Sequence, residues 1–375
     1  AGAALRIGLL TVPACAWWLA GLRVQGAYGI DVLAVTEDLR TVASRSRPDD
    51  VLRGLGNWFF YGGDRWGPTV DQASYYDHTT AVVVASFLVP LLALATAPVV
   101  RWRGRVVVVA MIATTVVAVG AWPYDDPSPF GRAFRWFTEQ SSLGMAFRNS
   151  PRVVPVLILG LALALAAAIA ATPARARRGA AAAVALVAVG GLAPVVRVGM
   201  LSDGVERPEH LPAYWEEAAA HLDASGDDTR VLELPGANFA AYRWGNAIEP
   251  ITPLLSRRPY LAREVLPYGS PESALLPDAL DRRLQNQVLD PASVAPVARL
   301  LGVGDVVVRS DLAYDRYGLP RPSTVWSMIV DPRAPGLGRP TTFGAPTPNV
   351  GEDPLDPLLP SDLRAGTPPR SRALA

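Results

Sequence analysis

Five apolar runs without a single internal charge constrain what this chain of 375 residues can fold into. Each run is close to the length that crosses the hydrocarbon core of a bilayer, which takes about 20 residues in a helix. The runs cover residues 7–22, 79–100, 106–122, 153–172 and 180–196. We therefore predict an α-helical membrane protein with about five transmembrane helices. A soluble single-domain enzyme is excluded.

Arginines in the two shortest connections between runs predict the orientation. They are Arg101, Arg103 and Arg105 after the second run, and Arg175, Arg177 and Arg178 after the fourth. Short loops rich in Arg stay in the cytoplasm, so these two loops are assigned there. Alternation then places residues 23–78, residues 123–152 and the chain after residue 197 outside a bacterial plasma membrane.

The composition changes after the fifth run, which divides the chain into three parts. Residues 1–196 form the predicted transmembrane domain, with the outer loops 23–78 and 123–152. Residues 197–330 regain charge and turn signals and predict a mixed α/β domain outside the membrane. We expect helices at 213–222 and 278–288 and strands at 229–234 and 305–309. The proline-rich residues 331–375 predict a disordered tail or linker.

Charge and motif content exclude several classes of function. The 35 basic residues are balanced by 34 acidic ones, which argues against a nucleic-acid partner. The single Cys15 has no partner for an intrachain disulfide, and the sequence has no nucleotide-binding glycine loop and no metal-spaced Cys or His set. No cofactor is indicated, although a divalent metal stays open. The uncharged spans also disfavour an ion-coupled transporter or a flippase.

The first outer loop is rich in aromatic and glycine residues between Trp58 and Tyr76. One interpretation is an interfacial aromatic belt. The other is a platform on which flat rings meet sugar faces while arginine takes a phosphate. Under the second interpretation, the candidate substrate-binding residues of the loop are Arg53, Asn57, Trp58 and Tyr61. Composition does not separate the two.

A glycosyl transfer needs a carboxylate to take the acceptor proton. Glu37 and Asp38 are weak candidates for this base, since a loop acid more often faces solvent, caps a helix or forms an ion pair. Asp49 and Asp50 follow Pro48 and precede an apolar stretch, so we interpret them as the first residues of a helix. The sequence leaves the catalytic base unassigned.

Two further segments carry candidate binding groups. In the second outer segment, Ser128 and Pro129 predict the start of an amphipathic helix that either lies flat on the membrane or lines a groove for a lipid-linked substrate. In the outer domain, Arg243 and Trp244 follow a predicted strand, where binding residues often lie. A loop that packs its aromatics onto the domain is the alternative.

Three stretches together resemble a known family. They are GLRVQGAYGIDVLAVTED with VLRGLGNWFFYGGDRWGP, then PSPFGRAFRWFTEQSSLGMAFRNSPR, and then RVLELPGANFAAYRWGN with RRPYLAREVLPYGSP. The chain is similar to the actinobacterial alpha-(1->3)-arabinofuranosyltransferases, large membrane glycosyltransferases of the GT-C class. The resemblance implies transfer of arabinofuranose from a decaprenyl-phosphate donor to the arabinan of arabinogalactan or lipoarabinomannan, outside the plasma membrane.

The sequence departs from this family in two respects. The resemblance puts the family's proposed catalytic acid in a segment upstream of Ala1, and its carbohydrate-binding modules are missing. We therefore expect a fragment of a longer enzyme that lacks the N-terminal catalytic segment. A non-catalytic envelope scaffold that binds glycan is the alternative function.

Overall fold

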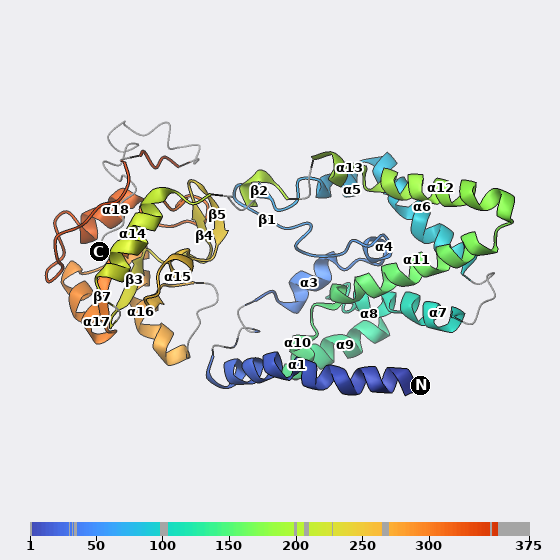
Figure 1. Cartoon of the computed structure of the whole chain (residues 1–375), viewed down its shortest axis with the longest axis horizontal. Helices are drawn as coiled ribbons and strands as arrows, with labels where there is room; N and C mark the ends of the chain where they lie inside the picture. The colour runs from blue at the N-terminus through green and yellow to red at the C-terminus, as the bar shows by residue number, and fades with distance from the viewer. Residues whose placement is uncertain are drawn as a thin grey trace. The chain divides into compact units, whose positions relative to one another are not determined.

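The computed structural model describes residues 2–29, 31, 33, 36–97, 104–198, 201–205, 210–226, 228–264, 270–345 and 347–351. They divide into two compact units, shown in Figure 1. Thr36–Val205 form the helical unit, and Ala1–Val35 with Glu206–Ala375 form the second unit, whose downstream part we call the α/β domain. Each unit is described separately below.

Helices occupy all five apolar runs. The runs correspond to α1 (Gly2–Tyr28), α6 (Thr80–Thr96), α7 (Arg105–Ala113) with α8 (Thr115–Val119), α11 (Val154–Ala171), and α12 (Ala174–Gly191) with α13 (Ala193–Val198). Within the described residues, two helical segments, Leu5–Tyr28 and Ser150–Ala171, are long and apolar enough to cross a membrane. Two shorter apolar segments, Thr80–Thr96 and Arg105–Val119, accompany them.

The core of the helical unit lies between α6, α7 and α11. Leu157 and Leu161 of α11 are almost fully buried there, next to Val108 of α7. Gly160 allows this close packing, because a Cβ at that position would lie 2.7 Å from Cβ of Met111. Large apolar side chains also face outward, among them Leu91 on α6 and Leu159 on α11, each about half exposed. An outward apolar surface of this kind suits contact with lipid.

Short elements gather at one end of the helical bundle, opposite the turn between α11 and α12 (Figure 1). They are α3 (Leu39–Arg45), α4 (Pro48–Leu52), α5 (Ala73–His78), α9 (Pro129–Gln140), α10 (Ser142–Ala146), the 3-10 turns Ser150–Val153 and Asp203–Val205, and the hairpin of β1 (Gly63–Asp64) and β2 (Gly67–Pro68). The helix predicted after Ser128 is confirmed: it is α9, and the Ser128 side chain accepts a hydrogen bond from the amide of Gly131.

A three-stranded parallel sheet organises the α/β domain. β3 (Arg230–Leu234) lies between β6 (Tyr260–Leu261) and β7 (Val303–Val308), and the chain adds an antiparallel hairpin of β4 (Ala240–Tyr242) and β5 (Gly245–Ile248). The helices are α14 (Ala213–Ala224), α15 (Thr252–Leu255), α16 (Pro271–Gln285), α17 (Val294–Leu300) and α18 (Pro322–Ile329), with a 3-10 turn at Pro291–Ser293.

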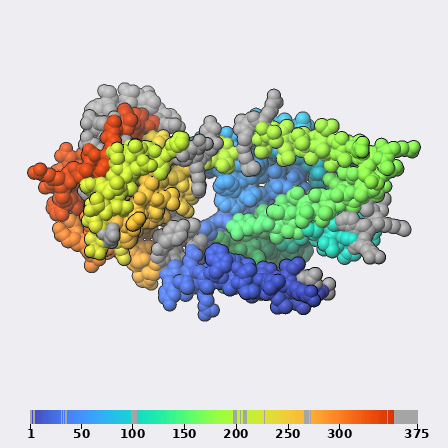
Figure 2. Space-filling model, viewed as in Figure 1, coloured from blue at the N-terminus to red at the C-terminus, as the bar shows by residue number. Residues whose placement is uncertain are grey.

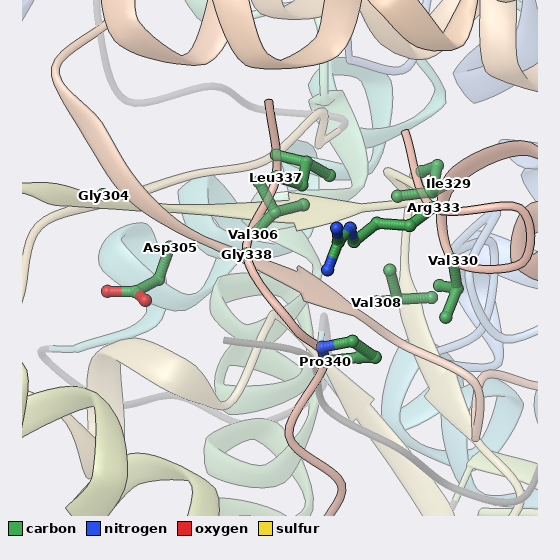
Figure 3. Close-up of a pocket in the computed structure, with 10 residues that line it drawn as sticks. All are labelled: Gly304, Asp305, Val306, Val308, Ile329, Val330, Arg333, Leu337, Gly338 and Pro340. Carbon is green, nitrogen blue, oxygen red and sulfur yellow. The ribbon is translucent and has the colours of Figure 1, made fainter. Parts of the chain in front are cut away.

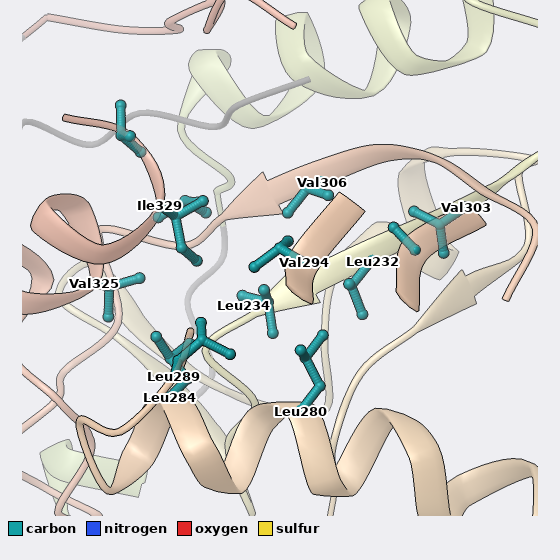
Figure 4. Packing of buried hydrophobic residues seen from close by; sticks show 13 residues of the cluster. Leu232, Leu234, Leu280, Leu284, Leu289, Val294, Val303, Val306, Val325 and Ile329 are labelled. Atoms are coloured by element: carbon teal, nitrogen blue, oxygen red, sulfur yellow. The ribbon is translucent and has the colours of Figure 1, made fainter. Parts of the chain in front are cut away.

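Helices cover both faces of this sheet, because successive side chains of a strand point to opposite faces. Leu232 and Leu234 of β3 pack against Leu280 and Leu284 of α16 (Figure 4), while Val231 packs into the cluster on the other face. Figure 2 shows these elements, coloured yellow to red, as one closely filled body. The predicted strands and the predicted helix at 213–222 are confirmed. The helix expected at 278–288 begins earlier, at Pro271, since Ser270 caps it and Pro277 does not interrupt it.

The described part of the proline-rich tail, up to residue 351, forms no helix or strand after α18 but packs on the α/β domain. The Asn349 amide donates to the carbonyl groups of Ser310 (2.6 Å) and Leu312 (2.9 Å). Leu337, Gly338 and Pro340 help to enclose a small cavity of about 180 Å³ beside β7, into which Arg333 points (Figure 3). Residues 352–375 lie outside the described residues, so the disordered tail stays a prediction there.

Candidate functional site

The first outer loop is organised around a buried ion pair between Asp50 of α4 and Arg53. Their side chains are only 7% and 4% exposed. Arg53 also donates to the carbonyl oxygen of Tyr76 (2.8 Å) and to the hydroxyl of Ser86 (3.4 Å), while its Nε finds no partner among the described residues. The predicted phosphate ligand Arg53 is thus enclosed by protein groups that join α4, α5 and α6.

Tyr61 closes one side of this pair. Its hydroxyl donates to Asp50 Oδ1 at 3.4 Å, and the guanidinium of Arg45 lies over its ring at 5.1 Å from the centroid. Burial raises the pKa of the Asp50 carboxyl, and Arg53 opposes that shift. Burial and the Asp50 charge likewise raise the pKa of Tyr61. Arg45 itself is exposed, and no ion pair is described for it.

Aromatic rings of the loop form one inner cluster and one outer pair. Phe60 turns inward and meets Tyr61 and Tyr76, at 5.0 and 5.8 Å between ring centroids. Trp58 and Phe59 meet edge to face at 5.8 Å, and Phe59 is 49% exposed. The Asn57 side chain accepts from the Phe59 amide at 2.9 Å, which fixes the turn that carries this outer pair. The loop therefore exposes the outer pair of rings to solvent, while the ion pair of Asp50 and Arg53 is buried beneath the loop.

The two acids considered as catalytic bases have structural partners. Asp38 caps α3 by accepting a hydrogen bond from the Thr41 backbone amide at 2.7 Å, and hydrogen bonding to the side chain and the backbone of Thr41 lowers the pKa of Asp38. Glu37 Oε1 accepts a hydrogen bond from the side-chain amide of Asn149 at 2.8 Å. The backbone carbonyl of Glu37 accepts one from Arg148 Nε at 2.5 Å. Both groups keep a face toward solvent, since Asp38 is exposed and Glu37 is half-exposed.

These contacts also join the first outer loop to the second outer segment. Besides the bonds from Arg148 and Asn149 to Glu37, Arg40 forms an exposed ion pair with Asp125 at 2.9 Å. Tyr124 and Glu139 are bridged by a hydrogen bond of 2.6 Å within the second segment. Sequence reasoning selected both segments but missed Arg148 and Asn149, because their contacts with Glu37 join residues more than a hundred positions apart.

Arg243 and Trp244 belong to the α/β domain, where they also have protein partners. Arg243 pairs with Asp315 at 2.5 Å and donates to Asn349 at 2.6 Å. Trp244 donates to the buried carboxylate of Asp311 at 2.9 Å and stacks on Tyr242. Tyr214 and Trp215 donate to the same oxygen of Asp311, at 2.9 and 2.8 Å. This arrangement holds β4, β5 and α14 together.

No group of three or more His, Cys, Asp or Glu side chains that could hold a metal occurs within the described residues. Asp49, Asp50 and Asp77 are close enough to influence one another electrostatically, yet Arg47 and Arg53 neutralise the first two. The described part of the site is thus suited to positioning by hydrogen bonds and rings.

Comparison with known proteins identifies similar chains. The family model described as "Alpha-(1->3)-arabinofuranosyltransferase, N-terminal GT-C domain" matches residues 5–365. A protein of Mycobacterium tuberculosis (strain ATCC 25618 / H37Rv) named Alpha-(1->3)-arabinofuranosyltransferase is 28% identical over 361 residues, which cover 90% of this chain and 25% of that protein. A protein of the same name from Mycolicibacterium smegmatis (strain ATCC 700084 / mc(2)155) is 28% identical over 354 residues, 89% of this chain and 24% of that one.

A solved structure shows the same fold. The cryo-EM structure of arabinofuranosyltransferase AftD from Mycobacteria superposes with a TM-score of 0.55 at 21% identity, over 90% of this chain and 21% of that chain. A mutant form of that protein gives a TM-score of 0.57 at the same identity. The chain therefore spans about a quarter of the length of the curated relatives it matches.

Proposed function

The chain belongs to the family of the N-terminal GT-C domain of alpha-(1->3)-arabinofuranosyltransferases, and on this premise we propose that it is part of a membrane enzyme that transfers arabinofuranose in cell-wall synthesis. The donor in this proposal is decaprenyl-phosphate-linked arabinofuranose, and the acceptor is the arabinan of arabinogalactan or lipoarabinomannan. The reaction takes place at the outer face of a bacterial plasma membrane, which five helices cross.

The match of the family model over residues 5–365 carries the proposal. The fold adds support, because both predicted outer segments meet at one end of the helical bundle through the contacts of Glu37 and Arg40. Segments on opposite sides of a bilayer of ~30 Å could not do so. Tyr76 and Gly191 support the same sidedness, since the Tyr76 hydroxyl donates to the Gly191 carbonyl at 2.9 Å near the ends of α5 and α12.

Within the site, we assign complementary roles to the loop residues. Trp58 and Phe59 stack on the donor sugar, and the exposed Arg45 faces the donor phosphate, where a fixed cation stabilises the departing charge. Arg53 and Tyr61 hold the loop in place through Asp50. Asn57 supports the turn. Arg243 and Trp244 belong to a separate binding surface of the α/β domain, and the catalytic base is left unassigned.

A transfer assay with the full-length protein tests this proposal. Membranes that contain it should move labelled arabinofuranose from the decaprenyl-phosphate donor to an arabinan acceptor, and a hexose donor of the same lipid should not replace it. Failure to transfer any pentose would contradict the proposal. Retained glycan binding without turnover would identify the protein as a non-catalytic envelope scaffold.

A further inference from the structure

An open cleft lies at the carboxyl ends of two parallel strands in the α/β domain. β3 ends at Leu234 and β6 at Leu261, and the residues that follow, Asn238 from one and Arg263 with Glu264 from the other, line the cleft. Its volume is about 470 Å³, within the range of ~300 to 1,000 Å³ that small-ligand sites occupy. In open α/β sheets, ligands bind in crevices at the carboxyl ends of the strands.

A buried carboxylate holds the walls of the cleft in place. Asp281 of α16 is 1% exposed and accepts from Arg263 Nε at 2.5 Å and from the Gly236 amide at 2.7 Å. Arg263 then reaches across to the side-chain oxygen of Asn238 at 2.6 Å. The loops after β3 and β6 are thus tied to the same helix, so the polar groups of the cleft are positioned before any ligand arrives.

The charges that line the cleft balance. Among the residues that line it, the two arginines Arg263 and Arg282 are equal in number to the two acids Glu264 and Asp278. Arg282 is exposed and Asp278 half-exposed, and neither side chain has a described hydrogen bond or ion pair. Burial raises the pKa of Glu264, with the charge of Glu233 adding to the shift. A cleft with many donors and acceptors but no net charge suits a neutral, hydroxyl-rich ligand better than a phosphate.

Aromatic rings lie beside these polar groups. Phe239, next to Asn238 in the loop after β3, lies 5.4 Å from Tyr317 between ring centroids and is 38% exposed. Tyr317 lines the cleft. Rings with an open face can stack on the carbon face of a sugar ring while charged and amide groups bind its hydroxyls.

We propose that this cleft binds a neutral oligosaccharide, which, if the proposed function holds, is a segment of the arabinan acceptor. In this arrangement Arg282 donates hydrogen bonds to sugar hydroxyls, and Asp278 accepts hydrogen bonds from them. Phe239 and Tyr317 supply the rings on which the sugar stacks.

Binding to the whole chain in detergent tests the inference directly, with a short linear oligo-arabinofuranoside as the probe and inorganic phosphate as its charged rival. The oligosaccharide should bind and phosphate should not compete with it. Arg282→Ala should weaken binding about tenfold or more, the effect of removing one charge-assisted hydrogen bond. Arg283→Ala, on the same helix but outside the cleft, is the matched control and should bind as the unchanged chain does.

Two results would overturn the inference: no binding of the oligosaccharide by the unchanged chain, or equal binding by the Arg282→Ala and Arg283→Ala variants. The full-length enzyme separates this outcome from the proposed function. There, Arg282→Ala should raise the KM for arabinan and leave the KM for the lipid donor unchanged. If the Arg282→Ala enzyme transfers with an unaltered KM for arabinan, the proposed role of the cleft is wrong and the proposed function stands. If the cleft binds the oligosaccharide but the full-length enzyme transfers nothing, the proposed function is wrong and the binding role of the cleft stands.

Discussion

Asp50 and Arg53 form an ion pair that is almost completely shielded from water at the base of the first outer loop. Surface ion pairs contribute little to stability, but removal of one partner of a buried pair leaves an uncompensated charge. The pair is in contact with Tyr61, and Arg53 donates to Tyr76 of α5 and to Ser86 of α6. The conformation of the loop that we propose to bind the donor therefore depends on this ion pair.

Arg53→Ala should lower the free energy of unfolding by about 3 to 5 kcal/mol, because it leaves Asp50 buried without its counter-charge. The measurement is thermal unfolding of the purified protein in detergent. Arg47→Ala is the matched control, since the Arg47–Asp49 pair is exposed and its loss should cost about 1 kcal/mol or less. An Arg53→Ala variant of unchanged stability that has lost transfer would instead place Arg53 in direct contact with the donor phosphate.

The cost of Arg53→Ala should depend on pH. Burial already raises the pKa of Asp50 while Arg53 opposes the shift, so loss of Arg53 raises this pKa further. A carboxyl whose pKa is higher in the folded than in the unfolded state destabilises the folded protein at pH values above that pKa. The destabilisation disappears as the pH falls and the carboxyl is protonated. The stability gap between the variant and the unchanged protein should therefore narrow as the pH falls through the raised pKa. A gap that stays constant with pH would show that Asp50 is not the group left uncompensated.

Trp58 should matter for the rate of transfer and not for folding. If its ring stacks on the donor sugar, Trp58→Ala should reduce kcat/KM roughly tenfold, the effect of ~1.4 kcal/mol, and Trp58→Phe should reduce it less. Trp136 on α9 is 69% exposed and offers a control with an equally large ring. Equal rates in the Trp58→Ala and Trp136→Ala variants would assign these rings to an interfacial aromatic belt.

Glu37→Gln and Asp38→Asn should both leave transfer largely intact, because each replacement keeps an oxygen that accepts the bond seen in the structure. Asp38→Ala removes the cap of α3 and should cost about 0.5 to 2 kcal/mol of stability. Transfer rates and thermal unfolding of the three variants check this. Complete loss of transfer in a stable Glu37→Gln variant would make Glu37 the catalytic base.

The predicted sidedness is testable without any assay of activity. Cysteines at Ser74 and Ser225 should react with an impermeant thiol reagent in intact cells, and a cysteine at Gly179 should be shielded. All three positions tolerate the change: the two serines are exposed, and a Cβ at Gly179 meets nothing within 4 Å. The reverse labelling pattern would invert the proposed topology.

Periodicity and apolar length were sufficient to predict the helices of the apolar runs and the parallel strands β3 and β7, whereas the short strand β6 was not predicted. The run 153–172 became α11 (Val154–Ala171), and the stretch TRVLEL became β3 (Arg230–Leu234). These elements follow from local patterns, in which burial of a whole face or a whole segment decides the structure. The same reasoning placed Asp49 and Asp50 at the start of a helix, α4, as the structure has them.

The partners of the site residues could not be predicted, because they depend on which segments the fold brings together. Arg148 and Asn149 meet Glu37 across more than a hundred residues of chain, and Trp244 meets Asp311. Asp50 and Arg53 are the exception. Their spacing of three residues places them on one face of a helix, which is a sequence signal for an ion pair.

Photo-crosslinking tests the central claim most directly. A decaprenyl-phosphate arabinofuranose analogue that carries a photoreactive group on the sugar should label residues between Thr36 and His78 of the full-length protein. Unlabelled donor should suppress this labelling, and Trp58→Ala should weaken it while Trp136→Ala does not. Labelling confined to other parts of the protein, or labelling that donor does not suppress, would contradict a donor site in the first outer loop.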